Sequence, residues 1–257
     1  MVSYRKVEAL SRGLTILRYV NEEQGATVGS LHAKSGLDKA TIVRMLETLE
    51  HDGYVTRCDG AHWRAAGKTL VLSGGYSAVR EMGRLASPVL SESREILKWP
   101  ASFGIFDRDA MIIADTTHDW RGMMVTRQPN HRPPMLTTSL GRAYLAFMED
   151  KEREALLSLL RRDPTGWNAL ANKPGKISEL IADIRQKGYA LADSNYMAHT
   201  FGGDIWGMSV PVRGKTRLYG SLVIMVLRRV IGEEEGVLDL APRMQEVAPR
   251  IAEALGG

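Results

Sequence analysis

The sequence contains a single cysteine, Cys58, among its 257 residues. One thiol cannot form an intramolecular disulfide, and it excludes a zinc site built on several thiolates. No run of about 18 or more apolar residues occurs, which excludes a membrane-spanning helix. The opening residues "MVSYRKVEALSRG" also lack the apolar core of a secretion signal. These absences predict a protein of the reducing cytoplasm, without contact to a membrane.

Signatures of catalysis are missing as well. The chain has no Gly-x-Ser-x-Gly elbow, no glycine-rich phosphate loop and no His-Glu-x-x-His motif. Its six histidines are scattered, and none is spaced with carboxylates as a set of metal ligands. Catalytic groups from distant positions can converge in space, so these absences disfavour an enzyme without excluding one. We expect no enzymatic activity, no metal site and no cofactor.

What is present fits a globular protein of about two domains, with 44% hydrophobic and 25% charged residues. The net charge is +4, a mildly basic balance that is compatible with nucleic acid. Residues 1–68 hold ten Lys and Arg against eight Asp and Glu, and the remainder holds 24 against 22. Positive charge is therefore not concentrated in one half, and a nucleic-acid function must be argued from pattern.

The first 65 residues predict three helices and a hairpin. Residues 7–23 carry apolar side chains three and four positions apart, which indicates one buried helix face; these are Val7, Leu10, Leu14, Leu17 and Val20. Thr27 is placed to cap a short helix that stops at Gly36, and Asp38 to cap a third helix reaching about His51. Strands near residues 54–56 and 62–64 then flank the Asp59-Gly60 turn signal. This order is that of a winged helix-turn-helix.

The third helix carries the features of a DNA-reading helix. Its first turn holds Lys39, Ala40 and Thr41, which are short or basic and do not repel phosphates, and Arg44 follows one turn later. We expect Arg12 and Arg64, together with Arg5, Lys6 and His62, to reach flanking phosphates. Two alternatives remain open: an ordinary solvated helix face, favoured by the acids at 47, 50 and 52, and a module that binds only protein.

The rest of the chain predicts an α+β domain with an antiparallel sheet. Residues 70–99 are helical in pattern, interrupted by two glycines and Pro88, and lead from a linker into the second domain. A hairpin turning at residues 107–109 comes next, then helices over 138–148, 151–162 and 177–188. Strands over 189–195, 205–213 and 217–227 precede a final helix over 233–255, disturbed at Pro242 and Pro249. Helices that are grouped, with strands mostly in neighbouring pairs, favour this architecture.

Thr137, Thr138 and Ser139 precede a predicted helix, where free N–H groups and the helix dipole favour a bound carboxylate. Simple capping of the helix is the alternative. His118, Arg121 and Arg127 lie in or beside a glycine-containing segment, and an arginine there is able to clamp a carboxylate. Residues of this kind are more often solvated or part of a subunit contact, so we do not assign them to the site.

The segments "ALSRGLTILRYV" and "SGLDKATIVRMLETLEHDGYVTR" resemble the N-terminal domain of the IclR family of bacterial transcriptional regulators. The resemblance continues through "LTTSLGRAYLAF", "IRQKGYALADSN", "GMSVPVR" and "YGSLVIMV". It implies a winged helix-turn-helix over residues 1–68, a linker helix that dimerises over 69–84, and a GAF-like or profilin-like effector domain over 85–257. The segment "WPASFGIFDRDAMIIADTTH" is similar to regulators of aromatic-acid catabolism of the hydroxyphenylpropionate type.

The resemblance also implies site residues and partners. The family's DNA-reading positions match Arg12, Lys39, Thr41 and Arg44. Its effector positions match residues at the start of the predicted helix and on three later segments: Ser139, Leu140, Asp193, Trp206, Val223 and Met225. The expected partners are a palindromic double-stranded DNA operator, a small carboxylate effector, a second copy or three further copies of the chain, and RNA polymerase.

Three of these positions suggest the kind of effector. Trp206, Val223 and Met225 replace the small or hydroxyl-bearing residues of relatives that bind small keto acids, which favours a larger aromatic or hydrophobic carboxylate. Asp193 is placed either to bond a hydroxyl of the effector or to form a turn. The alternative for the apolar residues is plain core packing. A second domain that only oligomerises, and an enzyme acting on a small carboxylate, are the rival functions.

Overall fold

The structure is a computed structural model, and it describes all residues except 1–5, 24, 59, 74–76, 118–131 and 163–165. The described residues form two compact units, and the chain passes from the first to the second at residues 76 and 77. We call these the N-terminal unit and the C-terminal unit and describe each by itself. No described helix is long and apolar enough to cross a membrane.

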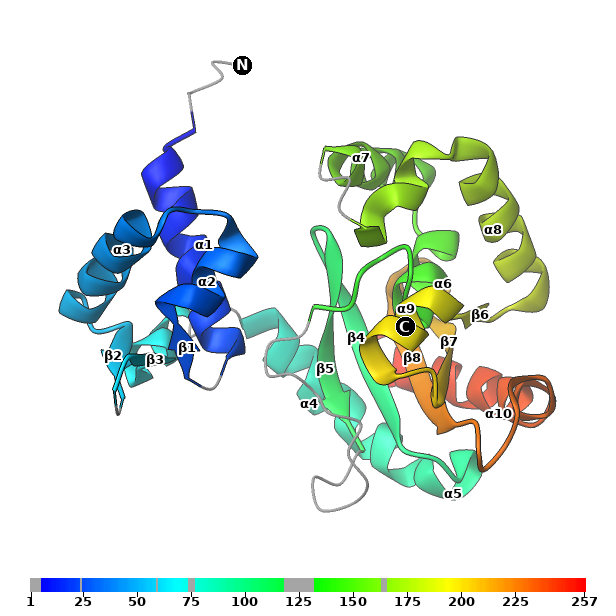
Figure 1. The fold of residues 1–257 in the computed structure, drawn as a ribbon. Coiled ribbons are helices and arrows are strands. Elements are labelled where there is room, and N and C mark those ends of the chain that lie inside the picture. Colours follow the sequence, from blue (N-terminus) through cyan, green and yellow to red (C-terminus); the bar gives the residue numbers. More distant parts are fainter. Residues whose placement is uncertain (1–5, 24, 59, 74–76, 118–131, 163–165) are drawn as a thin grey trace. The chain divides into compact units, whose positions relative to one another are not determined.

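The N-terminal unit is a winged helix-turn-helix, which confirms the sequence prediction (Figure 1). Its three strands form an antiparallel sheet in the order β1-β3-β2. The strand β1, only two residues long, was not foreseen. The elements are α1 (Glu8–Glu22), β1 (Ala26–Thr27), α2 (Val28–Ser35), α3 (Lys39–His51), β2 (Val55–Arg57) and β3 (His62–Ala65).

The predicted caps set the turn between α2 and α3. Thr27 and Ser30 form a capping box, in which each hydroxyl accepts from the other residue's backbone N–H at 3.0 and 3.1 Å. Gly36 ends α2 with φ +68°, a left-handed conformation that glycine adopts without steric cost. Asp38 then caps α3 by accepting from the N–H of Thr41 at 2.8 Å.

The apolar stripe predicted on α1 is only half correct. Leu17 and Val20 are buried as expected, together with Ile16, in the core of this unit. Val7, Leu10 and Leu14 are instead 65%, 62% and 55% exposed. The described core residues of α1 all lie in its C-terminal half, so the N-terminal half keeps its apolar side chains in the open.

The C-terminal unit contains a five-stranded antiparallel sheet in the order β5-β4-β8-β7-β6. Figure 1 shows α4 and α10 on one side of this sheet and α6, α7 and α8 on the other. The strands are β4 (Ala101–Asp107), β5 (Ala110–Thr116), β6 (Ala190–Leu191), β7 (Ile205–Arg213) and β8 (Leu218–Leu227). The helices are α4 (Ser77–Glu92), α5 (Arg94–Leu97), α6 (Ser139–Phe147), α7 (Asp150–Arg161), α8 (Pro174–Lys187), α9 (Ser194–Phe201) and α10 (Glu233–Ala254).

Side chains alternate along each strand between the two faces of the sheet. Phe103, Trp206 and Leu222 belong to the core shared with α4 and α10. Met111 and Val223 belong to the core shared with α6, α7 and α8. From residue 222 to residue 226 of β8, even-numbered side chains belong to the first core and odd-numbered ones to the second, and this determines which residues face the start of α6.

Several helical segments differ from the prediction. The helix α9 and the 3-10 segment η2 (Gly166–Asn172) were not expected. The helix α4 continues through Pro88 to Glu92, so the boundary expected between residues 84 and 85 falls inside a helix. Before it, residues 67–73 form the 3-10 segment η1, not an α-helix. Pro242 and Pro249 lie within α10 and do not interrupt it.

Candidate nucleic-acid interface and ligand site

The first turn of α3 presents the residues expected to read DNA. Lys39, Ala40 and Arg44 are exposed, and Thr41 is half-buried. The hydroxyl of Thr41 donates to Oδ2 of Asp38 at 2.6 Å. This bond is the largest influence that lowers the pKa of the Asp38 carboxyl. With its hydrogen committed in this way, Thr41 offers outward only its oxygen lone pairs and its methyl group.

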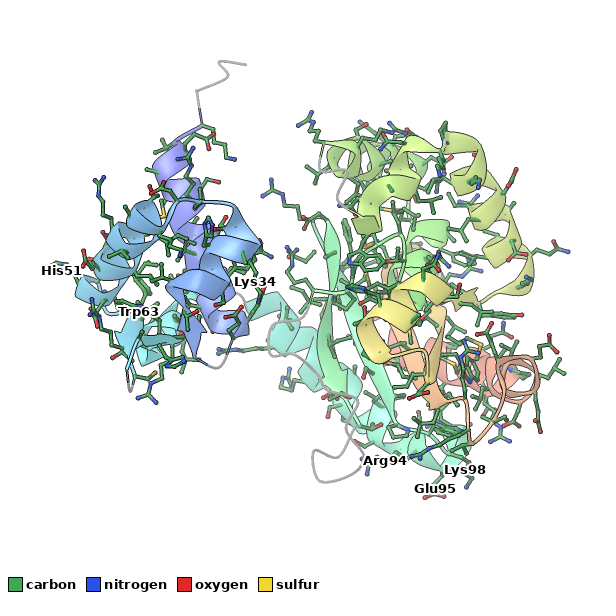
Figure 2. The ribbon with its side chains drawn as sticks, in the orientation of Figure 1. Lys34, His51, Trp63, Arg94, Glu95 and Lys98 are labelled. Atoms are coloured by element: carbon green, nitrogen blue, oxygen red, sulfur yellow. The ribbon has the colours of Figure 1, made fainter. Side chains whose placement is uncertain are left out.

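The basic residues of the N-terminal unit differ in whether a carboxylate holds them. Arg12 on α1, Arg44 on α3 and Arg64 on β3 are exposed and form no ion pair with any described residue. Arg57 instead lies 3.6 Å from Glu50 and 4.0 Å from Glu47, and its guanidinium covers the ring of Trp63, which Figure 2 labels. Glu47 and Glu50, which favoured an ordinary solvated face on α3, are therefore partly neutralised by Arg57 of β2.

Glu23, beyond the end of α1, ties α2 to α1. Its carboxylate accepts from the hydroxyl of Ser30 at 2.7 Å and pairs with Lys34. Burial raises the pKa of Glu23, but the bonds from Lys34 and Ser30 outweigh it, and the pKa is lowered overall. This contact fixes α2 against the end of α1.

In the C-terminal unit, the start of α6 has unused hydrogen-bond donors. Thr138 caps the helix, since its hydroxyl accepts from the N–H of Gly141 at 3.1 Å and its carbonyl from Arg142 at 3.0 Å. The N–H groups of Ser139 and Leu140, the first two helical residues, have no partner within the described chain. These residues are 3% and 2% exposed. The adjacent hydroxyl of Thr137 is also buried without a described partner.

The sheet face below this helix start is polar near its centre. The Ser209 hydroxyl on β7 donates to the Ser139 hydroxyl at 2.9 Å. Leu140 covers Gly104 on β4, where a Cβ atom would lie 2.6 Å from Leu140 Cδ2, so only glycine allows this approach. Val223 and Met225 on β8 point to the same side, because they pair with Ser209 and Gly207 across the strands.

Asp193 is occupied by contacts within the protein. Its carboxylate caps α9 by accepting from the N–H groups of Asn195 and Tyr196, and it lies 2.9 Å from Arg142 of α6. Arg142 also donates to the carbonyls of Leu136 and Leu191. Burial lowers the pKa of Arg142, and the charge of Asp193 counteracts this. Sequence reasoning missed Arg142, which holds the starts of α6 and α9 together.

Trp206 does not belong to this site, which corrects the expectation of a common wall with Val223 and Met225. It pairs with Val226 on β8, so its ring points to the opposite face of the sheet. There the ring packs against Gly236 of α10, and its Nε1–H donates to the carbonyl of Ile231 at 3.1 Å. Trp206 is a core residue, as the alternative reading had it.

Aromatic side chains of α9 and η2 form a cluster next to Met225. The ring of Trp167 lies 5.1 Å from that of Tyr196, which lies 6.3 Å from Phe201. Burial raises the pKa of Tyr196 to about 12, and Met225 packs against this cluster. The signal in the sequence is Asp193 and Gly202, a capping acid and a terminating glycine that bracket one short helix.

Other expected features remain without a structural account. His118, Arg121 and Arg127, like Arg5, lie outside the residues that the structure describes. Among the described residues, no group of three His, Cys, Asp or Glu side chains is placed to hold a metal ion.

Residues 9–58 match the IclR helix-turn-helix domain, and residues 76–252 match the bacterial transcriptional regulator IclR C-terminal domain. The HTH-type transcriptional regulator TsaQ1/TsaQ2 of Comamonas testosteroni is 28% identical over 209 residues, 79% of this chain and 72% of the relative.

Two solved structures share the fold over nearly the whole length. An IclR family transcriptional regulator from Brucella abortus is 26% identical, with a TM-score of 0.69 and coverage of 99% of this chain and 95% of that one. An IclR homologue complexed with 4-hydroxybenzoate, from Microbacterium hydrocarbonoxydans, has a TM-score of 0.65 at 17% identity and covers 96% and 99% of the two chains. With both domain models matched in order, the chain belongs to the IclR family of bacterial DNA-binding transcriptional regulators and is not an enzyme.

Proposed function

We propose that this regulator senses a small carboxylate, aromatic or hydrophobic, at the N-terminus of α6. The observation that carries the proposal is the pair of unpartnered N–H groups at Ser139 and Leu140 beside the buried, unpartnered hydroxyl of Thr137. Buried donors without partners are costly, and a carboxylate at a helix N-terminus satisfies them while it meets the positive end of the dipole. Ordinary capping by Thr138 leaves these groups unused.

The apolar surroundings support the aromatic or hydrophobic class. Val223 and Met225 line the sheet side, and the cluster of Trp167, Tyr196 and Phe201 stands behind Met225. Small keto acids have no apolar body to cover such a surface. The 4-hydroxybenzoate bound to the Microbacterium homologue belongs to the class we propose. Regulation of hydroxyphenylpropionate-type catabolism remains a narrower hypothesis within this class.

For the DNA half, we propose that α3 enters the major groove of a palindromic operator, with Lys39, Ala40, Thr41 and Arg44 toward the bases and Arg12 and Arg64 toward phosphates. A palindrome requires two copies of the chain, as a homodimer or homotetramer. Exposed apolar side chains support self-association, and they include Val7 just before α1, Leu10 and Leu14 on α1, and residues 70–72 of η1. Dimerisation through residues 69–84 and contact with RNA polymerase stay predictions.

The substitution Thr137→Val tests the ligand site, because it should change two measured quantities in opposite directions. Removing a buried hydroxyl that lacks a partner should increase the free energy of unfolding of the free protein by about 1 kcal/mol. Its melting temperature should therefore rise. The same change should reduce the rise in melting temperature that benzoate, 4-hydroxybenzoate or 3-phenylpropanoate causes, because the hydroxyl contacts the carboxylate. A purely structural role for Thr137 predicts a lower melting temperature without ligand.

The control is Thr48→Val on α3 of the N-terminal unit, where the Thr48 hydroxyl donates to the carbonyl of Arg44. This substitution should leave the effect of the ligand on the melting temperature unchanged. Pyruvate and glyoxylate complete the panel and should have little effect. If none of the acids stabilises the protein, the sensor proposal fails and a C-terminal unit that only oligomerises is favoured, while DNA binding is unaffected.

A further inference from the structure

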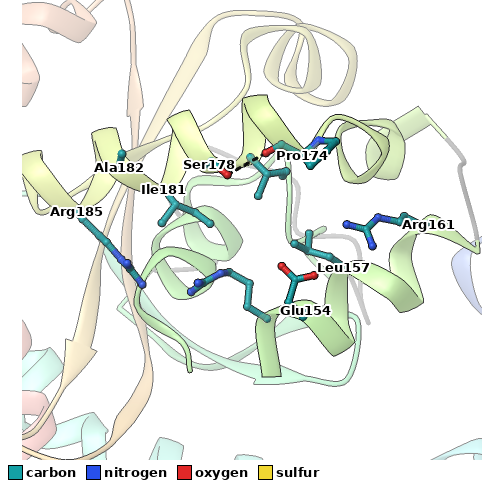
Figure 3. Close-up of a pocket in the computed structure, with 10 residues that line it drawn as sticks. Glu154, Leu157, Arg161, Pro174, Ser178, Ile181, Ala182 and Arg185 are labelled. Atoms are coloured by element: carbon teal, nitrogen blue, oxygen red, sulfur yellow. Dashed lines mark hydrogen bonds between the residues drawn. The ribbon is translucent and has the colours of Figure 1, made fainter. Parts of the chain in front are cut away.

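The C-terminal unit has a hollow between α7 and α8, whose lining contains no residue of the sheet (Figure 3). Its volume is about 410 Å³, within the range of small-molecule sites. We define this α7–α8 groove by its charged residues Arg153, Glu154, Arg161 and Arg185, its polar Ser178, and an apolar lining of Leu157, Pro174, Ile177, Ile181 and Ala182.

The three arginines of the groove are each held by a bond to a main-chain carbonyl. Arg161 donates through Nε to Ala171 at 2.9 Å, and Arg185 through Nε to Ala146 at 2.6 Å. Arg153 donates through Nη1 to Met148 at 3.0 Å. A guanidinium fixed in this way loses little further side-chain entropy when it binds an anion.

Two of the arginines have unused capacity. The terminal nitrogens of Arg161 have no partner within the described chain. Among the described carboxylates, Arg185 has only Asp150 nearby, at 3.8 Å, and that carboxylate is also paired with Arg153. Figure 3 shows Arg161 and Arg185 at opposite ends of the groove, with Glu154 between them. On α7, Arg153 and Arg161 are eight residues apart, or about 12 Å along the helix.

We propose that the α7–α8 groove is a second ligand site, which binds a small aliphatic dicarboxylate with one carboxylate at Arg161 and the other at the Arg185 end. Leu157, Ile177 and Ile181 supply an aliphatic floor for the chain between the two acid groups. Glu154, without a described partner, faces the middle of the ligand and opposes a charge placed there. The site therefore selects for acid groups at the two ends of an apolar body.

The experiment titrates octanedioate into the full-length protein labelled with ¹³C in its isoleucine methyl groups. The signals of Ile177 and Ile181, assigned through Ile→Val variants, should shift and saturate. Octanoate, with the same chain length and one carboxylate, should bind at least tenfold more weakly. Arg161→Gln should weaken octanedioate binding about tenfold, the effect of one charged contact.

A second variant keeps the test informative if Arg161→Gln disturbs the end of η2. Glu154→Gln loses no bond to a described residue and should tighten octanedioate binding several-fold, because it removes an opposing charge. Thr137→Val is the matched control and should leave this binding unchanged, which separates the groove from the α6 site. The proposal is overturned if Ile177 and Ile181 stay unshifted up to about 10 mM ligand, or if both groove variants bind like the wild type.

Discussion

At the scale of single residues, the bonds of the arginines separate structural from functional roles. Arg57, Arg142 and Arg153 each form an ion pair with a carboxylate. Arg142 and Arg153 also donate hydrogen bonds to main-chain carbonyls. Arg44 is exposed and unpaired among the described residues. The sequence suggested Arg44 from its position in a helix-turn-helix, and it could not show that Glu47 and Glu50 turn toward Arg57.

Arg44→Ala should weaken specific operator binding by about 1–3 kcal/mol, the usual worth of a contact to a base edge. Arg44→Lys separates the two possible contacts: a bidentate contact to guanine is lost with lysine, whereas a phosphate contact is largely kept. The measurement is a binding titration on operator and on unrelated DNA at fixed salt.

The control for Arg44 is Arg18→Ala on α1, which removes an exposed arginine that pairs with Glu22 at 3.5 Å. It should leave the preference for operator unchanged. Unaltered operator affinity in Arg44→Ala would remove this residue from the DNA-reading face.

At the scale of elements, the helix caps were the most predictable feature. The side of the sheet to which a strand residue points was the least predictable. Thr27, Gly36 and Asp38 act locally, through atoms within a few residues, so the sequence shows them directly. The side of the sheet that Trp206 faces depends on strand register and on Gly236, thirty residues later. The short strand β1 depends equally on a distant partner, since it exists only by pairing with β3. Local signals therefore predicted where elements begin, and tertiary contacts decided which residues meet.

The contact between Arg142 and Asp193 is the clearest case of two elements positioned by one pair. The Arg142 side chain is 13% exposed, and it spans from α6 to the residues before α9. Asp193→Asn keeps the ability to cap α9 but removes the charge, so it should cost about 3 kcal/mol or somewhat less by leaving a buried guanidinium unpaired. Chemical denaturation measures this loss.

A double variant distinguishes pairing from packing at this position. Arg142→Met alone should also destabilise, whereas Arg142→Met combined with Asp193→Asn should cost less than the sum of the single changes. Because the pair orders the start of α6, each single variant should also weaken benzoate binding. Strict additivity in both measurements would contradict a positioning role.

At the scale of the whole molecule, the chain has separate apolar cores on the two sides of residue 76. The N-terminal core is built from residues such as Ile16, Leu46 and Trp63, and none of its members is shared with the cores of the C-terminal unit. The hydrophobic core of the DNA-binding unit is thus separate from the cores of the C-terminal unit, in which we propose the ligand site. How a ligand changes DNA binding depends on the strength of the thermodynamic coupling between the units.

Calorimetry measures that coupling. Two units with separate cores should unfold in two transitions, the one of larger enthalpy belonging to the larger C-terminal unit. Leu46→Ala, a truncation in the N-terminal core, should destabilise the N-terminal unit by about 2–5 kcal/mol. It should therefore lower the midpoint temperature of only the smaller transition. A carboxylate at 100 times its dissociation constant should stabilise the C-terminal transition by about 2.7 kcal/mol. If the ligand shifts both transitions together, the units unfold cooperatively, and ligand binding directly stabilises the DNA-binding unit. If the ligand shifts only the larger transition, regulation must act by changing how two copies of the chain present their DNA-reading helices.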